Sequence, residues 1–264
     1  MKSSTDSNVI GAFLLGNIMD YERRFSGLNR LYQKDATDIL QQAHVIVAGV
    51  GGVGSWCVEA LARSGIGHLT LIDLDVVAES NINRQLPALS STLGESKIAV
   101  MAQRIQEINE NCHVTLIDDF LTEENLDELL GHFDHKNSWI VDAIDNVRVK
   151  AALIAWAKRH KFKIIVSGAA GGKIDAQSFK LDDLSKTYHD PLCASLKATL
   201  KKKYHLGKEG GKLNVPVIFS TENMQGSHKG KGGLNCAGYG SIVMMTATMG
   251  MMMASYVVNK IVDK

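Results

Sequence analysis

The stretch HVIVAGVGGVGSWCVEALARSGIG, residues 44–67, decides the fold of this chain. It begins as a short apolar run, breaks at Gly49, Gly51, Gly52 and Gly54, and resumes with apolar residues at helical spacing. The first glycine permits a tight turn, the second keeps a Cβ away from a ligand, and the last lets the helix pack closely. The N-terminus of that helix offers free N–H groups and the positive end of its dipole to an anion. The stretch therefore predicts a strand, a loop and a helix that bind a nucleotide.

A second apolar segment ends in carboxylates. HLTLIDLD, residues 68–75, places Asp73 19 residues after Gly54 and Asp75 two residues further on. A carboxylate at that spacing meets ribose hydroxyls in dinucleotide-binding folds. We therefore expect Asp73 to bind ribose and count Asp75 among the nucleotide-binding residues. The spacing alone does not choose between NAD and ATP.

Strands and helices alternate as far as residue 170. Three further strands are predicted in the segments CHVTLIDDF (112–120), SWIVDAID (138–145) and FKIIVSGAAGG (162–172). This order predicts an α/β fold with a Rossmann-like, doubly wound and mostly parallel sheet. Two later segments, 173–184 and 215–222, predict strands that extend the sheet in the antiparallel direction, with a basic helix at 191–205 between them.

We expect one continuous domain in three parts. Residues 1–42 form an N-terminal arm and helix, and residues 43–170 form the nucleotide-binding part. Residues 171–264 contribute the sheet extension, the basic helix, a loop rich in glycine and lysine, and an apolar C-terminal helix.

Composition limits the class of protein. The 264 residues carry a net charge of +1, so the overall charge gives no sign of a strongly charged partner. The four cysteines lie far apart with no C-x-x-C pair, which favours reduced thiols in a cytoplasmic protein and neither a disulfide framework nor a zinc site. Residues 241–258 are long and apolar enough to suggest a membrane span. We favour a buried helix there, because methionine and small residues suit close packing, and keep membrane association as the alternative.

Polar residues cluster after the second strand, in SNINRQ, residues 80–85. Asn81, Asn83, Arg84 and Gln85 are candidate nucleotide ligands there, with a plain polar loop as the alternative. Lys97 begins the next predicted helix, where a cation opposes the helix dipole. That placement suggests an outside anion such as a phosphate, although an exposed lysine on a frayed turn would look the same.

DAIDN, residues 142–146, ends the fourth strand at the edge where open α/β sheets bind ligands. Asp145 is a candidate ligand of Mg²⁺ bridging phosphates, or else the N-cap of the next helix, and Asn146 adjoins it. We expect Asp142 to be a structural hydrogen-bond acceptor. Arg84, Lys97 and Asp145 together suit a nucleotide that is cleaved, because fixed cations stabilise charge spreading over phosphate oxygens. They are our candidate catalytic residues, with ATP and Mg²⁺ as cofactors.

From about Arg24 to the C-terminus the chain resembles the E1-like adenylating enzymes of the ThiF/MoeB/HesA type. The resemblance rests on GVGGVGSW, LIDLDVVAESNINRQ, Lys97 and DAIDN. It implies an E1-like ATP-binding fold in which Asp73 contacts ribose, residues 81–84 and Lys97 hold phosphates, and Asp145 lies by the metal. It also implies a homodimer in which Arg24 or Arg30 reaches the partner's ATP, with cysteine desulfurase or sulfur-acceptor proteins as further partners.

Within that family, residues 24–36, 168–192 and 235–250 resemble the members that modify tRNA. This resemblance implies ATP-dependent dehydration of the threonylcarbamoyl group on adenosine 37 of tRNA, with ring closure through an adenylated carboxylate. Adenylation of a sulfur-carrier protein's C-terminus and an NAD(P)-dependent oxidoreductase remain the alternatives. Cys236 is expected to be a packing thiol, with acceptance of an acyl group as the alternative. The lysines that suit an RNA backbone are Lys197, Lys201, Lys202, Lys203, Lys208 and Lys212, joined by His228, Lys229 and Lys231.

Overall fold

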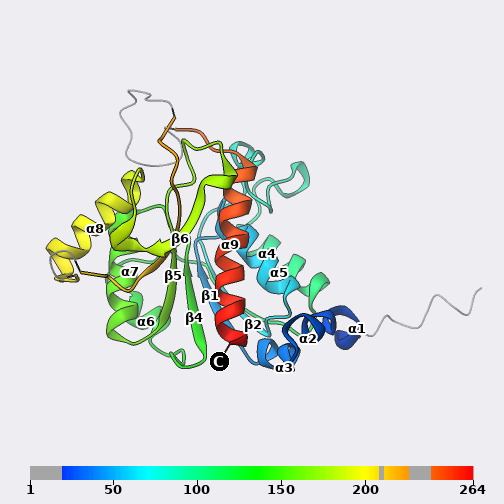
Figure 1. Cartoon of the computed structure of the whole chain (residues 1–264). Helices are drawn as coiled ribbons and strands as arrows, with labels where there is room; N and C mark the ends of the chain where they lie inside the picture. Colours follow the sequence, from blue (N-terminus) through cyan, green and yellow to red (C-terminus); the bar gives the residue numbers. More distant parts are fainter. Residues whose placement is uncertain (1–19, 208–210, 226–238, 264) are drawn as a thin grey trace, which may run out of the picture.

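A seven-stranded sheet in the order β3-β2-β1-β4-β5-β7-β6 organises the chain. The computed structural model describes residues 20–207, 211–225 and 239–263 (Figure 1). The strands are β1 (His44–Ala48), β2 (His68–Ile72), β3 (His113–Ile117), β4 (Ser138–Asp142), β5 (Lys163–Ser167), β6 (Phe179–Asp183) and β7 (Pro216–Ser220). The predicted α/β class and doubly wound sheet are confirmed.

The direction of one strand differs from the expectation. β6 pairs antiparallel with β7, as predicted, but β7 itself runs parallel to β5, with Val166 opposite Val217. The prediction that both late strands run antiparallel is therefore wrong for β7. The connection through helix α8 (Pro191–Tyr204) is long enough for a crossover, so the chain returns in the direction of β5 and leaves β6 at the edge.

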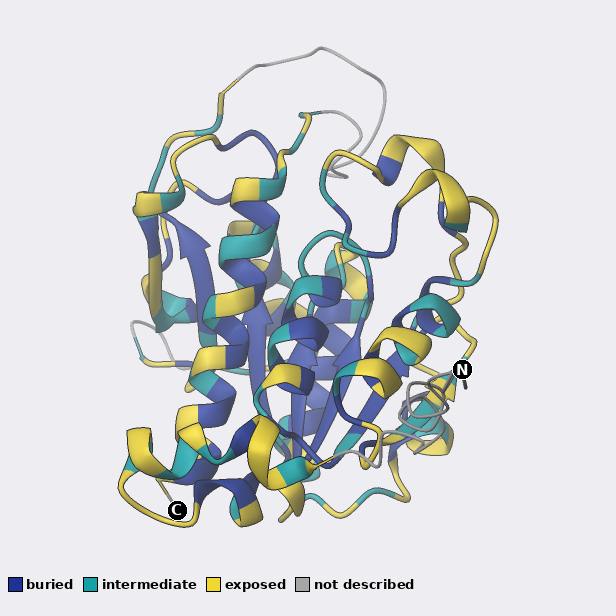
Figure 2. Ribbon diagram, turned by 90° about the vertical axis from the view of Figure 1, so that its right-hand side faces the viewer, coloured by how far each residue is buried: buried dark blue, intermediate teal, exposed yellow. Residues whose placement is uncertain are grey.

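Helices cover both faces of the sheet because the apolar side chains of its strands alternate. Val45 and Val47 of β1 pack on one face, while Ile46 and Ala48 pack on the other. The first face carries α3 (Ala36–Gln41), α4 (Gly54–Arg63), α5 (Lys97–Ile108) and α9 (Val243–Val262), and the second carries α6 (Leu126–Leu130), α7 (Val147–Arg159) and α8. Two short helices, α1 (Tyr21–Phe25) and α2 (Gly27–Tyr32), precede α3. Figure 2 shows the central strands buried behind helices that are exposed on their outer sides.

Helix α9 lies beside α4 on the sheet (Figure 1). Met245, Met249 and Met253 are buried on its inner face. A Cβ added to Gly250 would lie 2.4 Å from the Val53 carbonyl oxygen, so this glycine allows the two helices to touch. Within the described part of the chain, no helix is long and apolar enough to cross a membrane. The prediction of a buried helix is confirmed for the inner face of α9, whereas Met244 and Met251 on its outer face are exposed.

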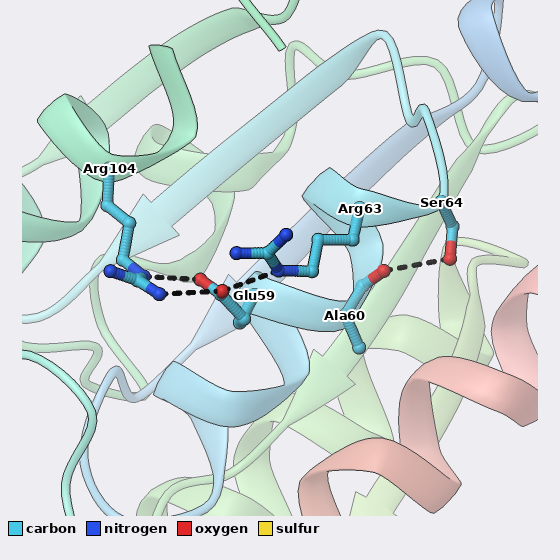
Figure 3. A network of polar contacts seen from close by, with 5 residues as sticks. All are labelled: Glu59, Ala60, Arg63, Ser64 and Arg104. Carbon is cyan, nitrogen blue, oxygen red and sulfur yellow. Dashed lines mark hydrogen bonds and ion pairs between the residues drawn. The ribbon is translucent and has the colours of Figure 1, made fainter. Parts of the chain in front are cut away.

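Helices α4 and α5 are joined by a charged cluster around Glu59 (Figure 3). The buried Glu59 carboxylate accepts bonds from Arg104 Nε at 2.6 Å, Arg104 Nη2 at 2.9 Å and Arg63 Nε at 2.7 Å. Burial raises the pKa of Glu59, but the hydrogen bonds from the two arginines lower it more, so this pKa lies below its ordinary value. The cluster fixes α5, which begins at Lys97, against the helix that follows the glycine loop.

Candidate nucleotide-binding site

A pocket of about 560 Å³ opens at the carboxyl ends of the parallel strands. β1 and β4 are neighbours there, and the chain leaves them toward opposite faces, so the pocket lies at the switch point where open α/β sheets bind ligands. Most of the residues predicted from sequence line it: Gly49, Gly51, Gly52, Asp73, Asp75, Arg84, Gln85, Lys97, Asp145 and Asn146. Residues from several separate segments therefore meet in one place.

The glycine loop has the geometry of an anion cradle. Gly49 has φ +86°, and a Cβ on Gly54 would lie 1.8 Å from the Gly49 carbonyl oxygen, so Gly54 permits the close turn although it does not line the pocket. Within the described residues, the N–H groups of Gly51, Gly52 and Val53 have no hydrogen-bond acceptor. Unpaired N–H groups before a helix of ten residues attract a phosphate.

Two carboxylates border the cradle. Asp73 Oδ2 accepts the Val50 N–H at 2.6 Å, and its Oδ1 accepts the Asp75 N–H at 2.9 Å. A carboxylate has about four lone-pair sites, so Asp73 can still accept bonds from ribose hydroxyls. Asp75 pairs with Lys97, whose Nζ lies 2.7 Å from Asp75 Oδ2. The cation at the start of α5 thus has a protein partner, which the residue pattern did not indicate.

The loop after β2 presents Arg84 and Gln85 to the pocket but not its two asparagines. Asn81 accepts the Ala78 N–H at 3.1 Å, and Asn83 Nδ2 donates to the Ser241 carbonyl at 2.8 Å. Both side chains hold the loop in shape, and neither lines the pocket. Gln85 Oε1 is buried without a partner in the described structure, so this amide is available to a ligand.

Arg84 is anchored through its backbone. Its carbonyl oxygen accepts bonds from Trp56 Nε1 of α4 at 3.1 Å and from Thr246 Oγ1 of α9 at 2.9 Å. Its guanidinium meets only local groups, the Ser80 carbonyl at 2.6 Å and Asn83 Oδ1 at 3.0 Å, among the described residues. The two helices therefore fix where Arg84 stands, and its charge remains at the pocket wall.

Asn146, rather than Asp145, caps helix α7. Asn146 Oδ1 accepts the N–H groups of Arg148 at 3.0 Å and Val149 at 3.3 Å. The Asp145 carboxylate lines the pocket with no protein donor among the described residues. In the same part of the chain, no group of three His, Cys, Asp or Glu side chains could hold a metal. One free carboxylate suits Mg²⁺, which is held by one or two carboxylates together with substrate phosphates.

A buried ion pair supports the loop that carries Asp145. Lys150 Nζ lies 2.9 Å from Asp142 Oδ1, and both side chains are wholly buried. The same Oδ1 accepts the Ile144 N–H at 3.1 Å, which confirms Asp142 as a structural acceptor. Burial raises the pKa of Asp142, while the Lys150 ammonium opposes that rise. The pair holds the turn from β4 into the pocket.

Sequence reasoning missed two parts of the pocket wall. Phe120, Leu121 and Thr122 follow β3, and with Ile144 and Val149 they provide an apolar slot suited to a flat base. The second part consists of residues 167–171 together with Leu192, Met224 and Tyr239. The rule that places Asp145 at the carboxyl edge of the sheet applies equally to the ends of β3 and β5, and it would have found residues 120–122 and 167–171.

The candidate RNA-binding lysines are less free than their spacing suggests. Lys197 Nζ donates to the Thr187 carbonyl at 2.8 Å, and Lys203 pairs with Glu123. Lys202 and Lys212 are both exposed, and Lys201 has an interaction of its own. Outside the described residues lie Lys208, His228, Lys229, Lys231 and Cys236.

The two candidate arginines differ. Arg24 Nη1 donates to the carbonyls of Glu107 at 3.1 Å and Ile108 at 2.8 Å, at the far end of α5 from Lys97. Arg30 is exposed at the last turn of α2. The Arg24 guanidinium is thus already bound to the C-terminal end of α5 within this chain, whereas Arg30 remains on the surface.

Comparison with known proteins identifies the family of this chain. Residues 21–264 match the ThiF family. The tRNA threonylcarbamoyladenosine dehydratase of Haemophilus influenzae is 44% identical over 263 residues, which cover 97% of this chain and 99% of the relative. Crystal structures of the Escherichia coli tRNA N6-threonylcarbamoyladenosine dehydratase in complex with AMP and with ATP each give a TM-score of 0.84, at 43% and 42% identity, covering 92% of this chain and 96% of theirs. The chain belongs to the ThiF family of E1-like proteins.

Proposed function

We propose that this chain is an ATP-dependent dehydratase that closes the threonylcarbamoyl group of adenosine 37 in tRNA into a ring. The observation that carries the proposal is a pocket that unites an amide cradle, Arg84, Lys97 and a free Asp145 carboxylate. Similarity to the Haemophilus influenzae dehydratase over almost the whole length of both chains supports the choice of substrate.

The geometry suits adenylation as the first step. An oxygen of the substrate carboxylate attacks the α-phosphorus of ATP, the bond from that phosphorus to the bridging oxygen breaks, and pyrophosphate leaves. The free N–H groups of the glycine loop and the cations Arg84 and Lys97 stabilise the charge that spreads over the phosphate oxygens. Asp145 would hold Mg²⁺, which neutralises phosphate charge when bound.

Ring closure then needs no second substrate. The carbamoyl group attacks the carbonyl carbon of the acyl-adenylate, its proton passes to solvent, and AMP leaves. The reacting groups belong to one nucleoside, so closure gains from proximity. The net change is the loss of one water from the substrate.

Two further features belong to the proposal. We infer a homodimer, because exposed apolar side chains gather on the loop after β2 and the start of α9, namely Ile82, Leu89, Leu93, Ile242 and Met244. Arg30 rather than Arg24 is then the candidate to reach the partner's ATP. Light scattering in dilute buffer tests the dimer, and a monomer would contradict it.

The tRNA would bind the α8 region, and the reaction would take place in the cytoplasm. Cysteine desulfurase or sulfur-acceptor proteins are further partners that the family resemblance implies.

Nucleoside mass spectrometry tests the substrate. The tRNA carrying threonylcarbamoyladenosine is incubated with enzyme and ATP·Mg²⁺, and the product nucleoside should be lighter by one water. A nucleoside of unchanged mass, with AMP transferred to a sulfur-carrier protein instead, would favour the alternative adenylation. Stabilisation against melting by NAD but not by ATP·Mg²⁺ would favour an oxidoreductase.

A further inference from the structure

The pocket extends beyond the part that suits a nucleotide. It continues past β4 to the end of β5, where residues 167–171 form the wall and Leu192, Met224 and Tyr239 complete it. The phosphate cradle, Arg84, Lys97 and Asp145 belong to the other part. A reaction between ATP and a second molecule needs room for both, and this extension provides it.

The backbone at this wall is hydrogen-bonded directly before two free amides. The Gly168 N–H donates to the Ile218 carbonyl at 2.8 Å, and the Ala169 N–H donates to Asp190 Oδ2 at 2.9 Å. The N–H groups of Ala170 and Gly171 have no acceptor in the described part of the chain, although both residues are buried and line the pocket. Buried N–H groups are rarely left unpaired, so among the described residues these two donors are open to an acceptor from a ligand.

The segments around these amides are rigidly connected. The Gly172 N–H donates to the Gly240 carbonyl at 3.0 Å, and its own carbonyl accepts the Gln225 N–H at 2.7 Å. The buried Lys173 Nζ donates to the carbonyls of His189, at 2.9 Å, and Glu222. Four stretches of chain are thus held together directly after the free amides, and the amides keep their position before any ligand arrives.

We propose that the N–H groups of Ala170 and Gly171 form an oxyanion hole for the ring-closing step, an inference that rests on the proposed function. When the carbamoyl group attacks the carbonyl carbon of the acyl-adenylate, the π pair of that carbonyl moves to its oxygen. The two N–H groups donate to this oxyanion. As the carbonyl re-forms, the carbon–oxygen bond to AMP breaks and AMP carries the bridging oxygen away. Fixed donors at such a position contribute strongly, because they need no reorganisation during the reaction.

Backbone esters test the assignment without adding a side chain. Ala170→lactic acid and Gly171→glycolic acid each replace one N–H by oxygen. The matched control is Ala176→lactic acid, because the Ala176 N–H also lacks an acceptor among the described residues but does not line the pocket. Each chain is assayed for formation of the cyclic nucleoside, for ATP–pyrophosphate exchange with modified tRNA, and for the melting shift caused by ATP·Mg²⁺.

The expected result separates the two steps of the reaction. Each ester at the pocket should lower the rate of ring closure by roughly 10²-fold, while exchange and the ATP-induced melting shift stay close to those of the control. Ring closure at the control rate in both variants would overturn the proposal. Equal losses of exchange and closure, or loss of the ATP shift, would also overturn it, because the amides would then serve the nucleotide. Failure of the proposed function would look different, since the unmodified enzyme itself would form no cyclic nucleoside.

Discussion

Lys97 Nζ lies 2.7 Å from Asp75 Oδ2 at the pocket, with the lysine side chain 5% exposed and the carboxylate 55% exposed. The pair therefore has one buried cation and one partner that reaches solvent. A phosphate entering the pocket meets a lysine already held in place, because Lys97 is fixed by α5 and α5 is fixed to α4 through Glu59. Helices α4 and α5 thus hold the Lys97 ammonium in place at the pocket that contains the glycine loop.

The cations of the pocket should matter for turnover more than for folding. Lys97→Ala and Arg84→Ala are each expected to reduce turnover roughly 10²-fold or more, the scale for losing one preorganised charge. Lys186→Ala is the control, since Lys186 forms an exposed pair with Asp182 outside the pocket. Steady-state rates of nucleotide consumption measure the effect, and near-normal rates in both pocket variants would contradict it.

Asp145 and its neighbour should separate function from stability. Asp145→Ala is expected to abolish Mg²⁺-dependent activity with little change in unfolding free energy, because the carboxylate has no protein partner among the described residues. Asn146→Ala should instead cost about 1 kcal/mol of stability through loss of the α7 cap. Activity against Mg²⁺ concentration and urea unfolding are measured on both variants. A stability loss in Asp145→Ala larger than in Asn146→Ala would show that the roles are reversed.

The contact between α9 and α4 should support nucleotide binding. Gly250→Ala places a Cβ 2.4 Å from the Val53 carbonyl oxygen, and overpacking of this kind typically costs about 1–3 kcal/mol. Because Val53 belongs to the glycine loop, the melting shift caused by ATP should shrink as well. Gly27→Ala is a fair control, since its added Cβ meets nothing closer than 3.7 Å. An unchanged ATP shift in Gly250→Ala would mean that the loop does not depend on this contact.

A histidine cluster at the opposite end of the sheet should make the fold sensitive to acid. The His44 ring stacks on the His68 ring, with the two ring centroids 3.8 Å apart. Its nitrogens Nδ1 and Nε2 form hydrogen bonds with Ser138 Oγ at 2.8 Å and Thr70 Oγ1 at 2.9 Å. Burial, with the nearby imidazoles of His68, His113 and His132, lowers the pKa of His44 to about 3.

A lowered histidine pKa favours the unfolded state in acid, since unfolding lets the imidazole bind a proton. The stability from neutral His44 is therefore complete above about pH 6.5 and falls as the pH drops from there toward 3. Urea unfolding at about pH 7.5 and about pH 5.0 should show a loss on the order of 2 kcal/mol for this group. His44→Gln should flatten the dependence, and an equally steep profile in that variant would assign the loss to other groups.

Local sequence determined the strand, the glycine loop and the helix that follows it. Glycine spacing and apolar periodicity restrict backbone conformation over a few residues, so the tight turn at Gly49, the close approach at Gly54 and the position of Asp73 follow from the residue pattern alone. The edge of the sheet where Asp145 lies follows from the same pattern, because the carboxyl ends of parallel strands meet at one edge.

Tertiary structure decided which polar groups face the ligand. Asn81, Asn83, Arg84 and Gln85 are polar residues of one short segment, and their sequence does not distinguish them. Only Arg84 and Gln85 line the pocket, because contacts with Ala78, Ser241 and α9 orient the loop. The parallel direction of β7 and the free amides of Ala170 and Gly171 depend on pairing between segments tens of residues apart. Such pairing is set by long-range packing and hydrogen bonding, so the local residue pattern does not predict it.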